Sequence, residues 1–161
     1  MKKAYFAGGC FWCITPTFKN TDGVISVVSG YSGGKEIDPK YEDVKAQKTG
    51  HRETIAVEYD EEAVSFEKLL DIFLRSVDPF DDGGQFIDRG HSYTLAVYYT
   101  SDKEKEIARQ AIGALKDDSG QEVFISIEQF TSFYPAEEYH QDYYLKNPKE
   151  FEEELKNSGR I

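Results

Sequence analysis

The chain has 161 residues, 39% hydrophobic and 14% aromatic, which is enough apolar material for a single domain over residues 1–161 and too much for a disordered chain. Its net charge of -11 disfavours nucleic acid and anionic membrane surfaces as partners, because like charges repel. No apolar run approaches the roughly 20 residues that span a bilayer, and glycines follow the first residues where a signal peptide would have its apolar core, so we expect a cytoplasmic location.

The first predicted elements surround the only two cysteines of the chain, in Gly8-Gly9-Cys10-Phe11-Trp12-Cys13. A strand is expected over residues 3–7 and a helix over about 10–20, so Cys10 falls where a strand turns into a helix. Backbone N–H groups and the positive end of the helix dipole favour a thiolate there, which predicts a lowered pKa for Cys10 and makes it the better nucleophile. Cys13 follows one helical turn later, within disulfide reach. The spacing therefore indicates a redox pair with an attacking and a resolving member.

Three other interpretations of the two cysteines remain open at this point. They could be buried apolar residues without chemistry, or a structural disulfide whose short loop constrains little of the unfolded chain. They could also be half of a zinc site, although the chain has no second Cys-x-x-Cys and its three histidines are far apart in sequence. In a reducing compartment, a catalytic or metal-binding pair is favoured over a structural disulfide.

Later segments complete an α+β pattern. Further strands are predicted over residues 24–31, 54–59, 93–99 and 123–130, and further helices from the Ser65 cap to Asp78-Pro79, over 102–116 and over 148–156. Long stretches without periodicity, 35–52 and 80–92, are expected to be functional loops. The aromatic tail, 133–144, is expected to pack over a core. The order contains the split βαβ pattern of ferredoxin-like folds, so we expect a two-layer α+β structure, with helices packed on a mixed, mostly antiparallel sheet.

Four motifs together carry a resemblance to a known family. They are Gly8-Gly9-Cys10-Phe11-Trp12-Cys13, Gly30-Tyr31-Ser32-Gly33-Gly34, Thr49-Gly50-His51-Arg52-Glu53, and the run from Phe133 to Gln141, Phe-Tyr-Pro-Ala-Glu-Glu-Tyr-His-Gln. In this order and spacing, over about residues 4–145, the chain resembles peptide methionine sulfoxide reductase A. Enzymes of this kind restore methionine from one epimer of its sulfoxide.

The resemblance implies a reductase specific for methionine S-sulfoxide, free or in proteins, and a role for each matching residue. Cys10 would attack the sulfoxide sulfur and become a sulfenic acid, and Glu53 would donate a proton to the oxygen. The remaining implied substrate contacts are Tyr41 and Tyr93 at the oxygen, Asp88 at the polar side, and Phe11 and Trp12 as an apolar wall for the methyl group. Cys13 would form a disulfide with Cys10, which thioredoxin or another dithiol would reduce. No bound cofactor or metal is implied.

The chemistry of the residues supports this division of labour. A sulfoxide oxygen leaves poorly unless it is protonated or strongly hydrogen-bonded. Glu53 must stay neutral near pH 7 to donate a proton, which requires a desolvated site that raises its pKa. Structural hydrogen bonds are the expected role of His51 and His140.

Departures from the family pattern affect three residues. Many relatives have another residue where Cys13 stands and resolve through cysteines in a C-terminal tail, whereas this chain has no other cysteine. Asp88 and Tyr93 match by spacing more than by flanking identity. Two other classes of protein are weighed beside the reductase: a thioredoxin-like disulfide oxidoreductase and a zinc-binding interaction module. Nothing in the sequence demands more than a monomer.

Overall fold

The computed structural model describes residues 1–141 and 143–157; Asp142 of the predicted aromatic tail and residues 158–161 lie outside the described residues. The strands are β1 (Lys2–Gly8), β2 (Val24–Ser32), β3 (Arg52–Tyr59), β4 (Gly84–Gln85), β5 (Asp88–Arg89), β6 (Leu95–Tyr99), β7 (Ile125–Gln129) and β8 (Phe133–Pro135). The α-helices are α1 (Phe11–Lys19), α2 (Tyr41–Lys45), α3 (Phe66–Ser76), α4 (Asp102–Ser119), α5 (Tyr143–Lys146) and α6 (Pro148–Asn157). Short 3₁₀ turns cover His91–Tyr93 and Glu138–His140.

Within the described residues, six strands form one sheet in the order β7-β6-β1-β3-β2-β8. Its four central strands, β6-β1-β3-β2, have the order and antiparallel pairing of a ferredoxin-like split βαβ core, and only the β6–β7 pair is parallel. The predicted two-layer α+β fold is therefore confirmed. Because β3 lies between β1 and β2, its residues are buried on both faces along most of its length.

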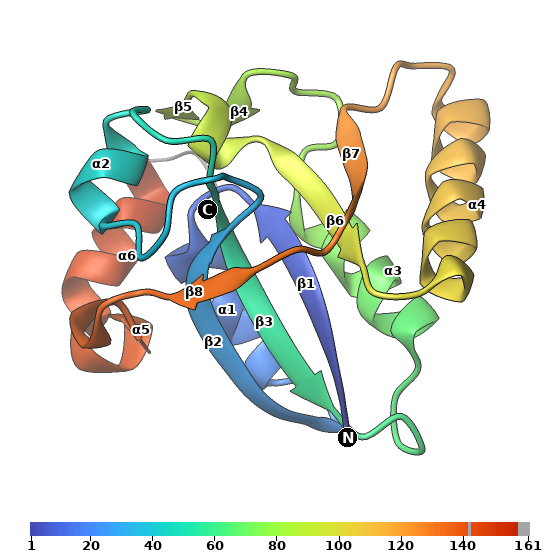
Figure 1. Ribbon diagram of the computed structural model, residues 1–161, viewed down its shortest axis with the longest axis horizontal. Coiled ribbons are helices and arrows are strands. Elements are labelled where there is room, and N and C mark those ends of the chain that lie inside the picture. The colour runs from blue at the N-terminus through green and yellow to red at the C-terminus, as the bar shows by residue number, and fades with distance from the viewer. Residues whose placement is uncertain (142, 158–161) are drawn as a thin grey trace.

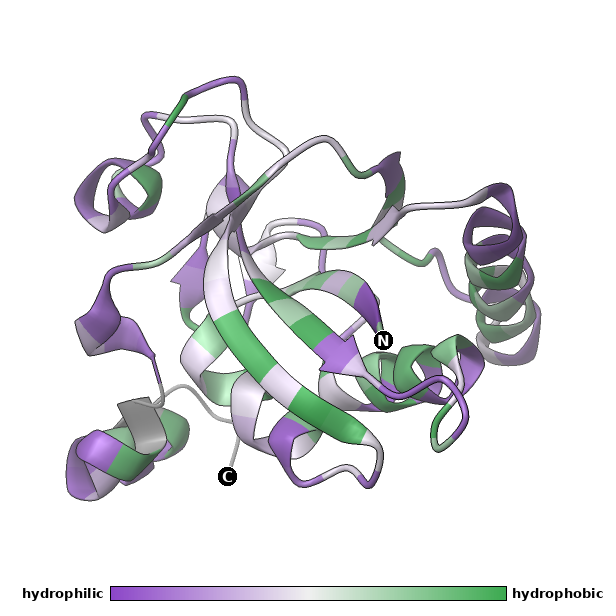
Figure 2. Ribbon diagram, turned by 60° about the horizontal axis from the view of Figure 1, so that its bottom comes forward, coloured by the Kyte–Doolittle hydropathy of each residue, from purple (hydrophilic) through white to green (hydrophobic). Residues whose placement is uncertain are grey.

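Helices α1 and α3 cover one face of this sheet, and α4 stands beside its β6–β7 end (Figure 1). The sequence explains α3 directly: Ser65 caps it by accepting a hydrogen bond from the Lys68 N–H (3.1 Å), and a stripe with helical spacing is buried against the sheet, Phe66, Leu69, Leu70 and Phe73. Hydrophobic residues accordingly concentrate on the central strands and α3, while hydrophilic residues dominate the outer loops (Figure 2).

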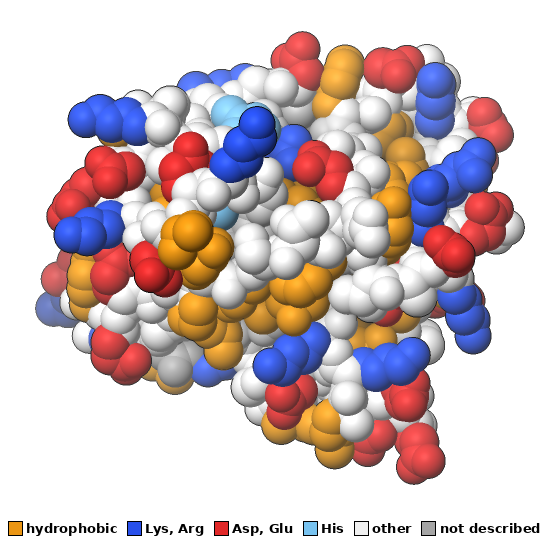
Figure 3. All heavy atoms as spheres, in the orientation of Figure 1, with side chains coloured by type: hydrophobic (Ala, Val, Ile, Leu, Met, Phe, Trp, Pro, Cys, Tyr) orange, Lys and Arg blue, Asp and Glu red, His pale blue; other side chains and the backbone are white. Residues whose placement is uncertain are grey.

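The opposite face of the sheet is only partly covered by the chain that follows β7. Phe130 stacks on Tyr5 of β1 with ring centroids 4.0 Å apart, and Phe133 lies 5.7 Å from the same ring. In the space-filling view, hydrophobic side chains gather over β8 and the lower part of the sheet, within a surface otherwise rich in charges (Figure 3). The aromatic tail thus packs on the sheet as predicted for Phe133, although Tyr139 is largely exposed.

Several predicted boundaries are wrong. Residues 35–52 are not structureless, because they contain α2 and the first residue of β3, and residues 80–92 contain the β4–β5 hairpin. Tyr93 lies in a 3₁₀ turn before β6, not in the strand. The short strand β8 was not expected; it pairs with β2 and places Tyr134 opposite Tyr31. No helix among the described residues is long and apolar enough to cross a membrane.

Candidate active site

The two cysteines lie at the junction between β1 and α1. Gly9 has a φ of +85°, a conformation that glycine adopts without strain, and it redirects the chain from the strand into the helix. Cys10 is the N-cap residue of α1, and its carbonyl accepts a hydrogen bond from the Cys13 N–H (3.1 Å). Cys10 is buried, Cys13 is half-buried, and both carry reduced thiols. The predicted placement of the pair is therefore confirmed.

Glu53 is buried directly beside this junction. Its side chain comes from β3, with an exposed residue surface of 1%, and its Oε1 accepts a hydrogen bond from the Phe11 N–H (3.2 Å). Burial raises the pKa of Glu53 from 4.5 to about 8, and the Phe11 N–H opposes this only in part. Glu53 therefore keeps its proton at neutral pH, as a general acid requires.

The expected lowering of the Cys10 pKa is wrong for this structure. A hydrogen bond with the Cys13 thiol and burial both raise the pKa of Cys10 well above the ordinary value, and the acidic groups around it add to the effect. The helix N-terminus does not reverse this, because its first N–H, that of Phe11, points to the Glu53 carboxyl. Cys10 is therefore a protonated thiol at neutral pH.

Tyr41, Asp88 and Tyr93 lie on three different segments, the helix α2, the strand β5 and the 3₁₀ turn before β6. Tyr93 is buried, and burial raises its pKa; nearby acidic groups raise it further, namely Glu53, Tyr41, Cys10 and Asp88. Asp88 also raises the pKa of both Cys10 and Glu53. Asp88 and Tyr93 therefore lie near Cys10 and Glu53, and Tyr41 lies near Tyr93.

Aromatic rings form one wall of the site. Phe11 is fully buried, Trp12 is half-buried, and their ring centroids lie 6.4 and 6.2 Å from the Tyr41 ring. The Trp12 indole Nε1–H donates to Nδ1 of His140 (3.2 Å), and the His140 ring lies 4.2 Å from the Tyr41 ring. Because Nδ1 accepts, the His140 proton is on Nε2, a buried atom with no hydrogen-bond partner among the described residues. Burial lowers the pKa of His140, so the ring is neutral.

Two residues that hold the site together were not identified from the sequence as site residues. Glu137 accepts hydrogen bonds from the Tyr31 hydroxyl (3.0 Å) and from the Tyr41 N–H (3.2 Å), so it ties the C-terminal segment to β2 and α2. Gln47 accepts from the Ser92 N–H (3.0 Å) and donates to the Ser92 hydroxyl (2.7 Å), which joins the segments of Tyr41 and Tyr93. Glu137 at least lies within a motif of the family; no pattern indicates Gln47.

The structural interpretation of His51 agrees with its contacts. Its ring is fully buried, its Nδ1 accepts from the Gly34 N–H (3.2 Å), and its Nε2 lies 2.8 Å from the Glu36 carbonyl. These bonds hold the loop after β2 against the start of β3. Among the described residues, no group of three or more His, Cys, Asp and Glu side chains is arranged to hold a metal ion.

A groove of about 700 Å³ opens next to the cysteine pair. Its wall includes Cys13, the α3 residue Ile72, Val77 and the hairpin residue Phe86, and it is mostly apolar. Cys13 therefore faces a space that a partner molecule can enter, whereas Cys10 lies deeper. A buried thiol, a protonated carboxyl and a second, half-buried thiol are the arrangement of a thiol-based redox enzyme.

Comparisons with known proteins identify the family within this class. The family model for peptide methionine sulfoxide reductase matches residues 2–160. A peptide methionine sulfoxide reductase MsrA 2 from Staphylococcus aureus is 44% identical, covering 99% of this chain and 93% of the relative. An MsrA from Bacillus licheniformis is 42% identical, covering 98% of this chain and 88% of the relative. The reduced form of Mxr1 from Saccharomyces cerevisiae superposes with a TM-score of 0.87 at 28% identity, covering 92% of this chain and 86% of Mxr1. The chain belongs to the peptide methionine sulfoxide reductase family.

Proposed function

We propose that this protein reduces the S epimer of methionine sulfoxide, free or in proteins, with Cys10 as nucleophile and Glu53 as general acid. Membership of the family supports the overall reaction. The observation that carries the residue roles is the Glu53 carboxyl, buried and protonated beside Cys10, with its Oε1 on the Phe11 N–H. The roles proposed for Phe11, Trp12, Tyr41, Asp88 and Tyr93 are those that the family resemblance implies, and their nearness to this pair supports them.

In the first step, the sulfoxide oxygen moves from the substrate to Cys10. Glu53 gives its proton to that oxygen as the S–O bond weakens, and its carboxylate receives the proton that the Cys10 thiol releases. The products are the thioether of methionine and a sulfenic acid on Cys10: the substrate sulfur gains two electrons and the Cys10 sulfur loses two. Tyr41 and Tyr93 donate hydrogen bonds to the oxygen, which adds to the acid catalysis.

The apolar wall gives the site its preference at the methyl group. Phe11 and Trp12 lie immediately after Cys10, so their rings can hold the S-methyl group beside the attacking sulfur. Asp88 occupies the polar side. With the methyl group and the oxygen fixed on opposite sides of the sulfur, only one epimer can place its oxygen against Glu53 and the tyrosines.

In the second step, Cys13 attacks the sulfenic acid, releases water and forms a disulfide with Cys10. Cys13 is the only other cysteine of the chain, and its backbone is already hydrogen-bonded to Cys10. Thioredoxin, or another dithiol, then reduces the disulfide. Mxr1 from Saccharomyces cerevisiae has also been solved in complex with Trx2. Since thiols supply both electrons, the cycle requires no bound cofactor, and it suits a single catalytic domain that works as a monomer in the cytoplasm.

Racemic methionine sulfoxide tests the proposal. The protein, supplied with dithiothreitol, should consume half of the racemate, and chiral chromatography should show that the R epimer remains. Cys10→Ser should consume none. Loss of the R epimer, or reduction by Cys10→Ser at the wild-type rate, would refute the proposed reaction.

A further inference from the structure

The turn of the β4–β5 hairpin carries two apolar side chains outward. Gly84 pairs with Arg89 and Gln85 with Asp88, so Phe86 and Ile87 form a two-residue turn. Phe86 is 38% exposed and Ile87 is 59% exposed. Phe86 has a φ of +55°, in a position of the turn where glycine is favoured and a bulky residue is uncommon. The chain therefore keeps a large apolar residue where backbone geometry argues against one.

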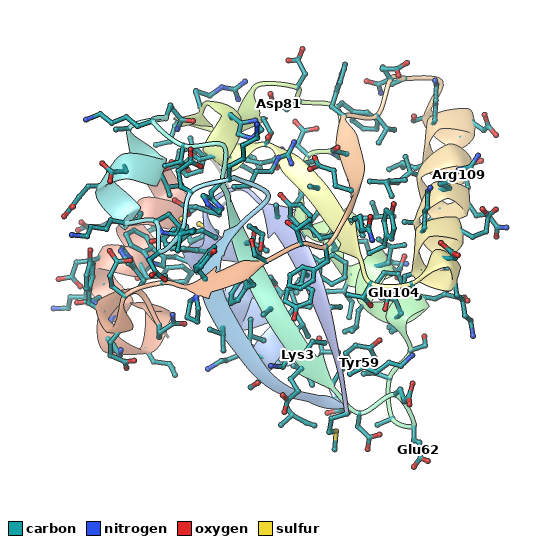
Figure 4. The ribbon with its side chains drawn as sticks, in the orientation of Figure 1. Lys3, Tyr59, Glu62, Asp81, Glu104 and Arg109 are labelled. Atoms are coloured by element: carbon teal, nitrogen blue, oxygen red, sulfur yellow. The ribbon has the colours of Figure 1, made fainter. Side chains whose placement is uncertain are left out.

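Surrounding contacts hold this turn in place. The Arg89 guanidinium binds both carboxylate oxygens of Asp81 (2.6 and 2.7 Å) and donates to the Phe86 carbonyl (3.1 Å). Asp81 lies beside the hairpin at the top of the view in Figure 4. Gln85 is fully buried and bonds both the N–H and the carbonyl of Asp78 (2.8 Å each). Strain that is held by its surroundings in this way is a frequent property of functional segments.

The turn adjoins both the groove and the candidate active site. Phe86 contributes to the wall of the groove that also contains Cys13. Asp88, one residue beyond Ile87, lies within electrostatic range of Cys10 and Glu53. A polypeptide whose oxidised methionine reaches Cys10 would therefore have its neighbouring residues close to the turn and the groove.

We propose that Phe86 and Ile87 bind apolar side chains flanking the methionine sulfoxide, so that the preferred substrates are apolar segments of polypeptides. This inference rests on the proposed function and specifies its substrate. Methionine is most often buried, so its neighbours in proteins are commonly apolar. Oxidation makes the side chain polar and disrupts such cores, which exposes these neighbours, and they can then bury surface against the turn and the groove.

Short substrates with different flanks test this proposal. Three are compared by kcat/KM: N-acetylmethionine S-sulfoxide, a pentapeptide with the S-sulfoxide between leucines, and the same peptide with serines. The wild type should prefer the leucine peptide over the serine peptide by about tenfold, the effect of partial burial of one or two apolar side chains. The double variant Phe86→Gly/Ile87→Ser should lose this preference and keep its rate on N-acetylmethionine S-sulfoxide. Glycine suits the positive φ, so the turn itself is preserved.

Ile25→Ser is the matched control, because Ile25 is 50% exposed on β2 near the opposite end of the sheet (Figure 1). It should retain the leucine preference. Equal wild-type rates on the two peptides, or a double variant that still prefers leucine, would overturn the inference. So would an equal loss on all three substrates, since that indicates a damaged site. Lack of wild-type activity on N-acetylmethionine S-sulfoxide would instead refute the proposed function.

Discussion

Glu53→Gln tests two effects of the buried carboxyl separately: its proposed role as an acid in the reaction, and the free energy of unfolding that its burial costs. Glutamine preserves the size of the side chain, and its carbonyl can still accept the Phe11 N–H that Glu53 accepts at 3.2 Å. The amide has no acidic proton to give. A positioned general acid accelerates a reaction by about 10²- to 10⁴-fold, so the rate of the first turnover should decrease by a factor in that range.

The same substitution should stabilise the fold at neutral pH. Burial raises the pKa of Glu53 from 4.5 to about 8, and each pKa unit corresponds to about 1.4 kcal/mol. Below pH 4.5 the folded and unfolded states both keep the proton, and nothing is lost. As the pH rises from 4.5 to about 8, only the unfolded state releases the proton, so the free energy of unfolding falls. The loss is about 3 kcal/mol at pH 7 and reaches about 5 kcal/mol above pH 8.

Urea unfolding at several pH values measures this cost, and rapid mixing with excess enzyme measures the first turnover. Between about pH 5 and pH 8.5 the wild type should lose several kcal/mol of unfolding free energy that Glu53→Gln retains. Glu58→Gln, at the other end of β3, is the control and should follow the wild type. Parallel pH curves for all three proteins would show that Glu53 is not held protonated. An unchanged first-turnover rate in Glu53→Gln would remove it from the mechanism.

Three further predictions concern the cycle and the supports of the site. Cys13→Ser should reduce one equivalent of sulfoxide and stop at a sulfenic acid on Cys10, detectable by mass spectrometry after dimedone labelling; repeated turnover with thioredoxin would show that Cys13 is not the resolving residue. The first-turnover rate of the wild type should fall above about pH 8, as Glu53 loses its proton; a rate that rises through pH 9 would indicate that thiolate formation limits the step. Glu137→Gln weakens an acceptor that holds the Tyr41 N–H (3.2 Å), so KM should rise several-fold, by about 1 kcal/mol, with a smaller change in kcat; an unchanged KM would mean that Glu137 does not position Tyr41.

Periodicity in the sequence was sufficient to predict the core of the fold. An apolar run, a β-branched run, an alternating run and the Ser65 cap placed β1, β2, β3 and α3, respectively, close to their observed bounds, because each buries apolar side chains in the core. The short elements had no such pattern. α2 has five residues with only Val44 buried, and β8 has three, so tertiary contacts decide them. β8 is held in place by its antiparallel pairing with β2, whose residues lie about 100 positions earlier in the chain.

The sequence predicted which residues lie in the candidate site better than it predicted their protonation states and contacts. The family motifs contain both Cys10 and Glu53, which lie close together in the structure, but the pKa of Cys10 is set by its hydrogen bond with Cys13 and by burial. The Phe11 N–H points to Glu53, and residue types alone specify neither of these contacts. Gln47 was missed for a similar reason: it has a φ of +63° and makes two hydrogen bonds to Ser92, 45 residues away, and no pattern of residue types predicts either feature.

A thiol and a carboxylic acid that both keep their protons suit this reaction better than an ionised thiol would. Susceptibility of a cysteine to oxidants follows its thiolate character and its exposure. Cys10, buried and protonated, is therefore protected against oxidants in solution. In the mechanism proposed above, the sulfoxide oxygen would take the Glu53 proton, and the resulting carboxylate beside Cys10 would take the thiol proton. The nucleophile would then form only with its substrate in place, and the buried Glu53 would couple the two events.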